Sequence, residues 1–107
     1  MAASVKTGSF TGTGAALNVE LGFVPTYVRI WNETDGGLIG EWVEGLTDDY
    51  YYKSADNAAN QFTVETANGV TPYDPTDYSS KKGFTVGTDL SVSAKVYRYM
   101  AFRDGGY

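Results

Sequence analysis

Leu17-Asn-Val-Glu-Leu21 is a stretch in which apolar and polar side chains alternate, and Tyr27-Val-Arg-Ile-Trp31 alternates in the same way. Successive side chains of a β-strand point to opposite faces, so a period of two is typical of strands with one buried face. We therefore predict a strand in each stretch. Their buried side chains would be Leu17, Val19, Leu21, Val28 and Ile30.

Gln61–Thr66 shows the same period and would direct Phe62 and Val64 inward. Phe84 and Val86 are further expected members of the core. The longest run is Leu90–Arg103, which predicts a strand that bends or carries a bulge, because most strands are shorter. The residues on one parity of this run are Leu90, Val92, Ala94, Val96, Met100 and Phe102. We expect this parity to supply Val92 and Val96 to the core. Tyr97 and Tyr99 occupy the other parity.

Turn signals separate these stretches. Thr34-Asp-Gly-Gly37 predicts a hairpin between Val28–Trp31 and Leu38–Val43. Thr71–Asp77 contains two prolines, which cannot donate to a ladder, and is expected to be a loop. Ser54–Asn60 could form one helical turn, but no amphipathic helix is visible. The sequence therefore predicts a single all-β domain over residues 1–107, a compact antiparallel β-sandwich or small barrel.

Composition excludes several classes of function. The 107 residues include no Cys and no His, so thiolate chemistry and the commonest general base are both missing. With 8 Lys and Arg against 13 Asp and Glu, the net charge of −5 argues against a nucleic-acid partner. No signal peptide is recognisable, and no apolar stretch approaches the ~20 residues that span a bilayer. We expect a protein made in the cytoplasm, with no membrane partner.

The sequence offers few candidates for catalysis. Gly8–Gly14 is rich in glycine, but a strand follows it where a phosphate-binding loop would need a helix, so we interpret it as a turn. Carboxylates are the remaining candidates, since a pair held across a cleft could hydrolyse a glycoside. We favour the interpretation that they are exposed acids on turns. Calcium at the loop of Asp74 and Asp77 is a weaker alternative. We expect no enzyme, cofactor or metal. The carboxylate pairs are Asp48 with Asp49, Asp74 with Asp77, and Glu41 with Glu44.

The aromatic residues are the most informative feature, with 9 Tyr, 5 Phe and 2 Trp. Tyr50-Tyr-Tyr52 must place at least one ring away from the core of any strand. Trp31 shares its parity with Tyr27 and Arg29, opposite Val28 and Ile30. Such side chains could form a second core layer, a protein–protein surface, where Tyr, Trp and Arg are enriched, or a platform for sugars. The candidate interface residues are Tyr27, Arg29, Trp31, Tyr50 and Tyr52.

Several motifs resemble small bacteriophage virion proteins. The opening Thr7–Trp31 is similar to their Gly-aromatic-Thr-Gly turn, followed by an alternating strand that ends Leu-Gly-Phe-x-Pro and then by another strand. Asn68–Tyr73, Lys82–Asp89 and Tyr97–Arg103 resemble the closing half of the same group. The match covers about two-thirds of the chain, and Gly40–Asn60 is less distinctive.

This resemblance implies a β-sandwich-like fold, self-association (often as trimers) and the major capsid protein as a partner. It implies no catalytic residues. The short chain favours a head decoration or cement protein on the outer surface of the head. The alternative that the resemblance leaves open is a receptor-binding domain of a tail fibre, which would stack host glycans on Tyr or Trp.

Overall fold

The computed structural model describes residues 4–55, 62–76 and 81–104. These residues form strands and one short 3₁₀ helix, η2 (Thr88–Leu90). The all-β prediction is confirmed. The strands are β1 (Ser4–Thr11), β2 (Leu17–Glu20), β3 (Tyr27–Asn32), β4 (Leu38–Val43), β5 (Tyr51–Ala55), β6 (Phe62–Glu65), β7 (Val70–Tyr73), β8 (Gly83–Val86) and β9 (Val96–Arg103).

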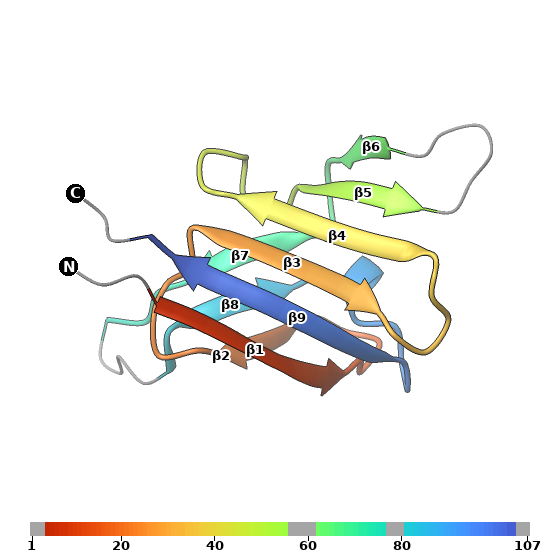
Figure 1. Cartoon of the computed structure of the whole chain (residues 1–107), viewed down its shortest axis with the longest axis horizontal. Coiled ribbons are helices and arrows are strands. Elements are labelled where there is room, and N and C mark those ends of the chain that lie inside the picture. Colours follow the sequence, from red (N-terminus) through yellow and green to blue (C-terminus); the bar gives the residue numbers. More distant parts are fainter. Residues whose placement is uncertain (1–3, 56–61, 77–80, 105–107) are drawn as a thin grey trace.

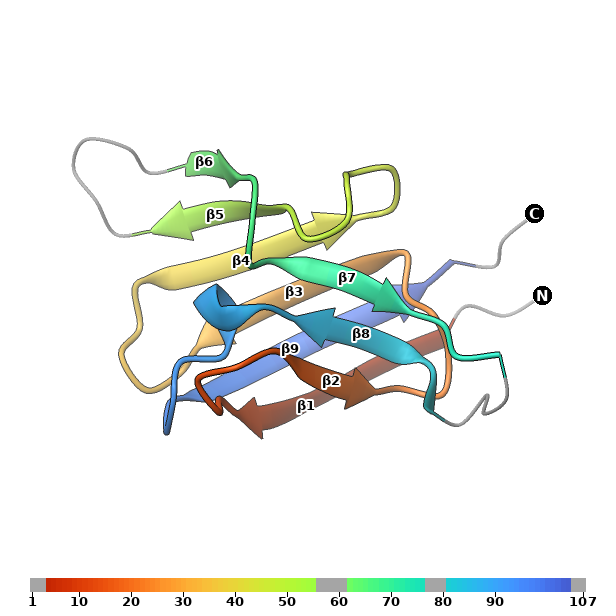
Figure 2. The ribbon, with the colours of Figure 1, turned by 180° about the vertical axis from the view of Figure 1, so that it is seen from behind.

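Two antiparallel sheets pack face to face as a sandwich (Figures 1 and 2). The larger sheet has the strand order β1-β9-β3-β4-β5-β6, and the smaller has the order β2-β8-β7. The predicted hairpin joins β3 to β4, with Trp31 opposite Ile39. Its turn contains Gly36 and Gly37 at φ of 70° and 71°, a conformation that glycine adopts without steric cost.

The core lies between the two sheets. Phe84 of β8 is fully buried and meets Tyr99 of β9 edge to face, with ring centroids 5.6 Å apart. Within the larger sheet, the ring of Tyr97 stacks on that of Phe10 of β1, with ring centroids 5.3 Å apart. Side chains from both sheets thus interdigitate, as in other sandwiches. The buried hydrophobic residues are Val19, Leu21, Val28, Ile30, Trp42, Tyr51, Val70, Phe84, Val86, Leu90, Tyr97, Tyr99 and Ala101.

Three residues predicted for the core are exposed instead. Phe62 and Val64 are 60% and 48% exposed, and Val92 is 44% exposed. Phe62 and Val64 belong to β6, the last strand of the six-stranded sheet, which extends beyond the three-stranded sheet (Figure 1). Alternation correctly placed these two side chains on one face. That face, however, is not covered by a second layer.

The predicted parity of the last strand is also wrong. Tyr97 and Tyr99 are buried, whereas Val96, which was predicted for the core, lies with Met100 and Phe102 on the opposite side of β9. The reason is a turn before the strand, in which Ala94 has a φ of 67° and Lys95 N donates to Val92 O. The strand starts only at Val96, so the alternation that precedes this turn does not set its phase.

The loop predicted over Thr71–Asp77 needs a correction, because Thr71, Pro72 and Tyr73 belong to β7. Pro72 pairs with Phe84 of β8, and β7 is an edge strand, where a residue without an N–H is tolerated. The helical turn predicted from Ser54 is likewise wrong at its start, since Ser54 lies in β5. Residues 56–60 lie outside the described part of the chain.

Candidate functional site

The candidate site is the face of the six-stranded sheet that points away from the smaller sheet. Val28 and Ile30 of β3 point into the core, so Tyr27, Arg29 and Trp31 point outward. The strand register places side chains of β4 and β9 beside them on the same side. These are Ile39, Glu41 and Val43 on β4 and Arg98, Met100 and Phe102 on β9.

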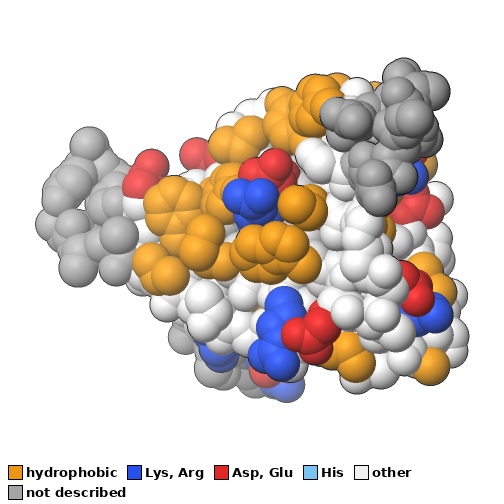
Figure 3. Space-filling view, turned by 45° about the vertical axis from the view of Figure 1, so that its right-hand side comes forward, with side chains coloured by type: hydrophobic (Ala, Val, Ile, Leu, Met, Phe, Trp, Pro, Cys, Tyr) orange, Lys and Arg blue, Asp and Glu red, His pale blue; other side chains and the backbone are white. Residues whose placement is uncertain are grey.

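This outer face continues to both edges of the sheet. Tyr52 on β5 pairs with Val64 on β6, and its ring stacks on Phe62 at 5.7 Å. At the other edge, Val5 of β1 is 62% exposed and pairs with Phe102. Figure 3 shows hydrophobic side chains gathered around a few charged groups. Four of the five exposed large hydrophobic residues in the described ranges belong to this face, namely Val5, Val43, Phe62 and Val64.

A small polar cluster lies on the two central strands of the outer face. Arg29 and Glu41 are partners across β3 and β4. The hydroxyl of Tyr27 donates to Glu41 Oε2 at 2.5 Å. The guanidinium of Arg29 lies over the Trp31 ring, 5.3 Å from its centroid. Arg29 Nε is buried and has no hydrogen-bond partner within the described ranges.

Two tyrosine hydroxyls that lie beside a carboxylate have a pKa above the usual range. Burial, followed by the hydrogen bond and the charge of Glu41, raises the pKa of Tyr27 from 10.0 to about 12. Burial also raises the pKa of Tyr51, whose hydroxyl donates to Asp89 Oδ2 at 3.1 Å. In both cases a carboxylate beside the hydroxyl disfavours a second negative charge.

We expect the free energy of unfolding to fall as the pH rises from 10 towards 12. In that interval the unfolded chain releases tyrosine protons that the folded chain still holds at Tyr27 and Tyr51, so unfolding becomes more favourable. Urea unfolding at neutral pH and at steps between pH 10 and 12 measures the slope. Tyr27→Phe should flatten it, and an unchanged slope in that variant would contradict the assignment to Tyr27.

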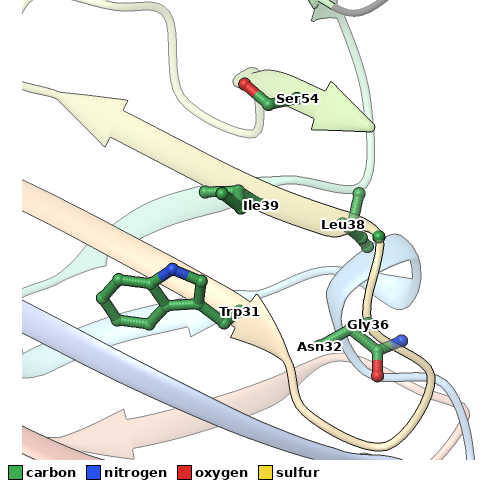
Figure 4. A pocket seen from close by; sticks show the side chains of 7 residues that line it. Trp31, Asn32, Gly36, Leu38, Ile39 and Ser54 are labelled. Atoms are coloured by element: carbon green, nitrogen blue, oxygen red, sulfur yellow. The ribbon is translucent and has the colours of Figure 1, made fainter. Parts of the chain in front are cut away.

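A pocket of ≈ 380 Å³ opens at the end of the outer face, where β3 turns into β4. Trp31 and Ile39 lie on neighbouring strands in Figure 4, with Ser54 beyond them on β5. Asn32 contributes an amide at the opposite side, where its Oδ1 accepts from Asp35 N at 3.0 Å. An apolar wall with polar groups near it can hold one apolar side chain or the flat face of a sugar ring. Gly36, Gly37 and Leu38 complete the lining.

The carboxylates singled out from the sequence are scattered. Glu41 belongs to the outer face, whereas Asp49 Oδ2 accepts from Asn68 N at 3.1 Å, in a turn. Glu44 and Asp74 both line a second pocket of ≈ 590 Å³, where Lys82 Nζ lies 2.8 Å from Asp74 Oδ1. Asp77 is outside the described residues. Within those residues no group of three potential metal ligands is found.

The structure brings together four of the five predicted interface residues. Tyr27, Arg29, Trp31 and Tyr52 lie on one face, and each is half-buried. Tyr50 precedes β5 and has no partner in the strand register. The register therefore does not place Tyr50 on the outer face. Sequence reasoning missed other members of the face. The alternation of β4 could have revealed Ile39, Glu41 and Val43, whereas Val5, Met100 and Phe102 gave no clear signal.

No helix among the described residues has the length and apolar character needed to cross a membrane. Comparison with family models, curated proteins and solved structures found no match to this chain.

Proposed function

We propose that this chain is a non-enzymatic structural protein of a bacteriophage particle, a decoration or cement protein that binds the major capsid protein on the outside of the head. The observation that supports this role best is the outer face. It carries Val5, Val43, Phe62 and Val64 at 41–62% exposure, together with half-buried aromatic rings. An apolar surface of this breadth favours association with another protein.

The residue types on the outer face support a protein partner. Tyr, Trp, Met and Arg are enriched at protein interfaces, and Tyr27, Trp31, Met100 and Arg29 all lie here. None of these side chains is among the buried residues of the monomer core. A cement protein acts by mass action, because it binds the assembled shell and not the separated subunits, and so opposes disassembly. In an assembled particle either the shell or a sister subunit would cover this face.

The proposal predicts that particles lacking the protein break up more readily on heating or in low salt. Purified protein added back should restore their resistance, and Val43→Asp should restore it less, because a charge would enter the apolar face. Light scattering and electron microscopy of heated particles measure the surviving fraction. A matched control is Glu20→Lys, since Glu20 is exposed on β2 in the other sheet. Bare particles that are as robust as decorated ones would overturn the proposal.

A receptor-binding domain of a tail fibre is the second candidate, and the pocket beside Trp31 favours it. An indole next to the Asn32 amide and the Ser54 hydroxyl offers the stacking surface and polar groups that a sugar requires. On this alternative, purified protein would coat host cells and block phage adsorption. Trp31→Ala would abolish the block, and particle stability would not depend on the protein.

A further inference from the structure

We infer that the outer face binds the same face of a second copy, in a two-fold symmetric dimer whose axis runs between β3 and β4. This inference rests on the proposed role of the outer face as an assembly surface, and it names the partner. It also departs from the trimers that the family resemblance implies. Two features support the dimer, namely the charges at the centre of the face and their position in the strand order.

The charged pair lies where a symmetric contact would have its centre. β3 and β4 are the third and fourth of the six strands, and Arg29 and Glu41 are opposite each other across them. Glu33 forms an ion pair with Arg98, but neither Arg29 nor Glu41 takes part in an ion pair within the described ranges. The centre of the face thus contains one cation and one anion on adjacent strands.

This pair restricts the partners that fit. Glu41 accepts from Tyr27 and Arg29 lies over Trp31, but a wholly apolar partner would remove the remaining water from both charges without replacing it, which is costly for charged groups. A suitable partner must therefore place an anion opposite Arg29 and a cation opposite Glu41, one strand spacing apart. A second copy of this chain has both groups at that spacing.

Symmetry then matches the remaining side chains of β3 and β4. An in-plane two-fold axis parallel to the strands places β3 of one subunit over β4 of the other. Arg29 then faces Glu41 of the partner subunit, and the converse contact forms as well. Trp31 faces Ile39 of the partner subunit, and Tyr27 faces Val43 of the partner subunit. One self-complementary patch favours such an isologous dimer, whereas a three-fold ring needs two different patches.

The face is large enough for this contact. The molecule extends 42 × 28 × 21 Å, and the view along its shortest axis in Figure 1 looks onto the six-stranded sheet. A stable interface buries about 800 Å² per partner, which is a part of that face. The flanking apolar residues of β5, β6 and β9 would then surround the central charges.

Charge exchange tests the inference on the full purified chain. The wild type should sediment at twice 11.6 kDa in analytical ultracentrifugation over the micromolar range. Arg29→Glu and Glu41→Arg should each weaken the dimer at least tenfold, because each places like charges opposite one another. An equimolar mixture of the two variants should associate again, since the changed residue of each chain then faces an opposite charge. The variant that carries both Arg29→Glu and Glu41→Arg should also dimerise, because its two charges are exchanged and each still faces an opposite charge.

Matched controls separate this effect from net charge and from misfolding. Lys81→Glu and Glu20→Arg make the same charge changes at residues outside the outer face, and they should leave the dimer intact. Far-UV circular dichroism reports whether each variant folds. A wild-type monomer or trimer would overturn the inference, as would a mixture that associates no better than its components. A monomer that still protects particles would refute the dimer alone, and a dimer that does not protect them would refute the proposed function alone.

Discussion

Replacing Phe84 with alanine is expected to lower the free energy of unfolding by about 3–5 kcal/mol. Phe84 is fully buried on the central strand of the smaller sheet and meets Tyr99 of the larger sheet. Its removal leaves a cavity between two sheets that are each held by their own ladders, so neither can collapse fully into the space. The whole domain is expected to have only about 5–15 kcal/mol of stability.

The matched control for this prediction is Phe62→Ala. Phe62 is 60% exposed on β6 and contacts Tyr52, so its loss should cost about 1 kcal/mol or less. Urea unfolding of both variants at low protein concentration measures the difference. Equal losses would contradict the division between a covered and an uncovered face of the six-stranded sheet.

Replacing Gly83 with alanine is expected to cost about 3 kcal/mol or more, near the upper end for overpacked sites. Gly83 is buried and pairs with Glu20 of β2 and with Tyr73 of β7. An added Cβ would collide with the carbonyl oxygen of Val19. Because the obstacle is backbone, no change of rotamer can relieve the collision, and the pairing of β2 with β8 must shift.

Thermal unfolding followed by circular dichroism should show this loss, since each 1 kcal/mol lowers the Tm of a domain of this size by about 4–8 °C. Gly36→Ala is the control. Gly36 has a φ of 70°, with nothing within 4 Å of an added Cβ. Only the strain of a left-handed conformation remains there, about 1–2 kcal/mol. If Gly36→Ala proved more damaging than Gly83→Ala, the close approach of β2 to β8 would be wrong.

Much of the candidate site could be predicted from local sequence. The common face of Tyr27, Arg29 and Trp31 follows from alternation within one strand, and the hairpin at Thr34–Gly37 follows from turn chemistry. Once the hairpin is known, its register adds Ile39, Glu41 and Val43 to that face. The phase of β9 could not be predicted, because the turn at Ala94 interrupts the alternation. For this reason the alternation groups Met100 and Phe102 with Val92, on the parity from which core residues are expected.

The sequence by itself determined that the chain forms strands, where the first hairpin lies and which neighbouring side chains share a face. These properties depend on interactions between residues close together in the chain. The period of two indicates the strands, and the pair of glycines indicates the turn. Only the tertiary structure decided which face is covered. Val19 and Val64 both alternate with polar neighbours, yet one is buried and the other is 48% exposed. The difference arises because the smaller sheet, assembled from strands distant in sequence, covers only one side of the larger sheet. Val19 belongs to the core between the two sheets, whereas Val64 lies on the uncovered outer face of the larger sheet.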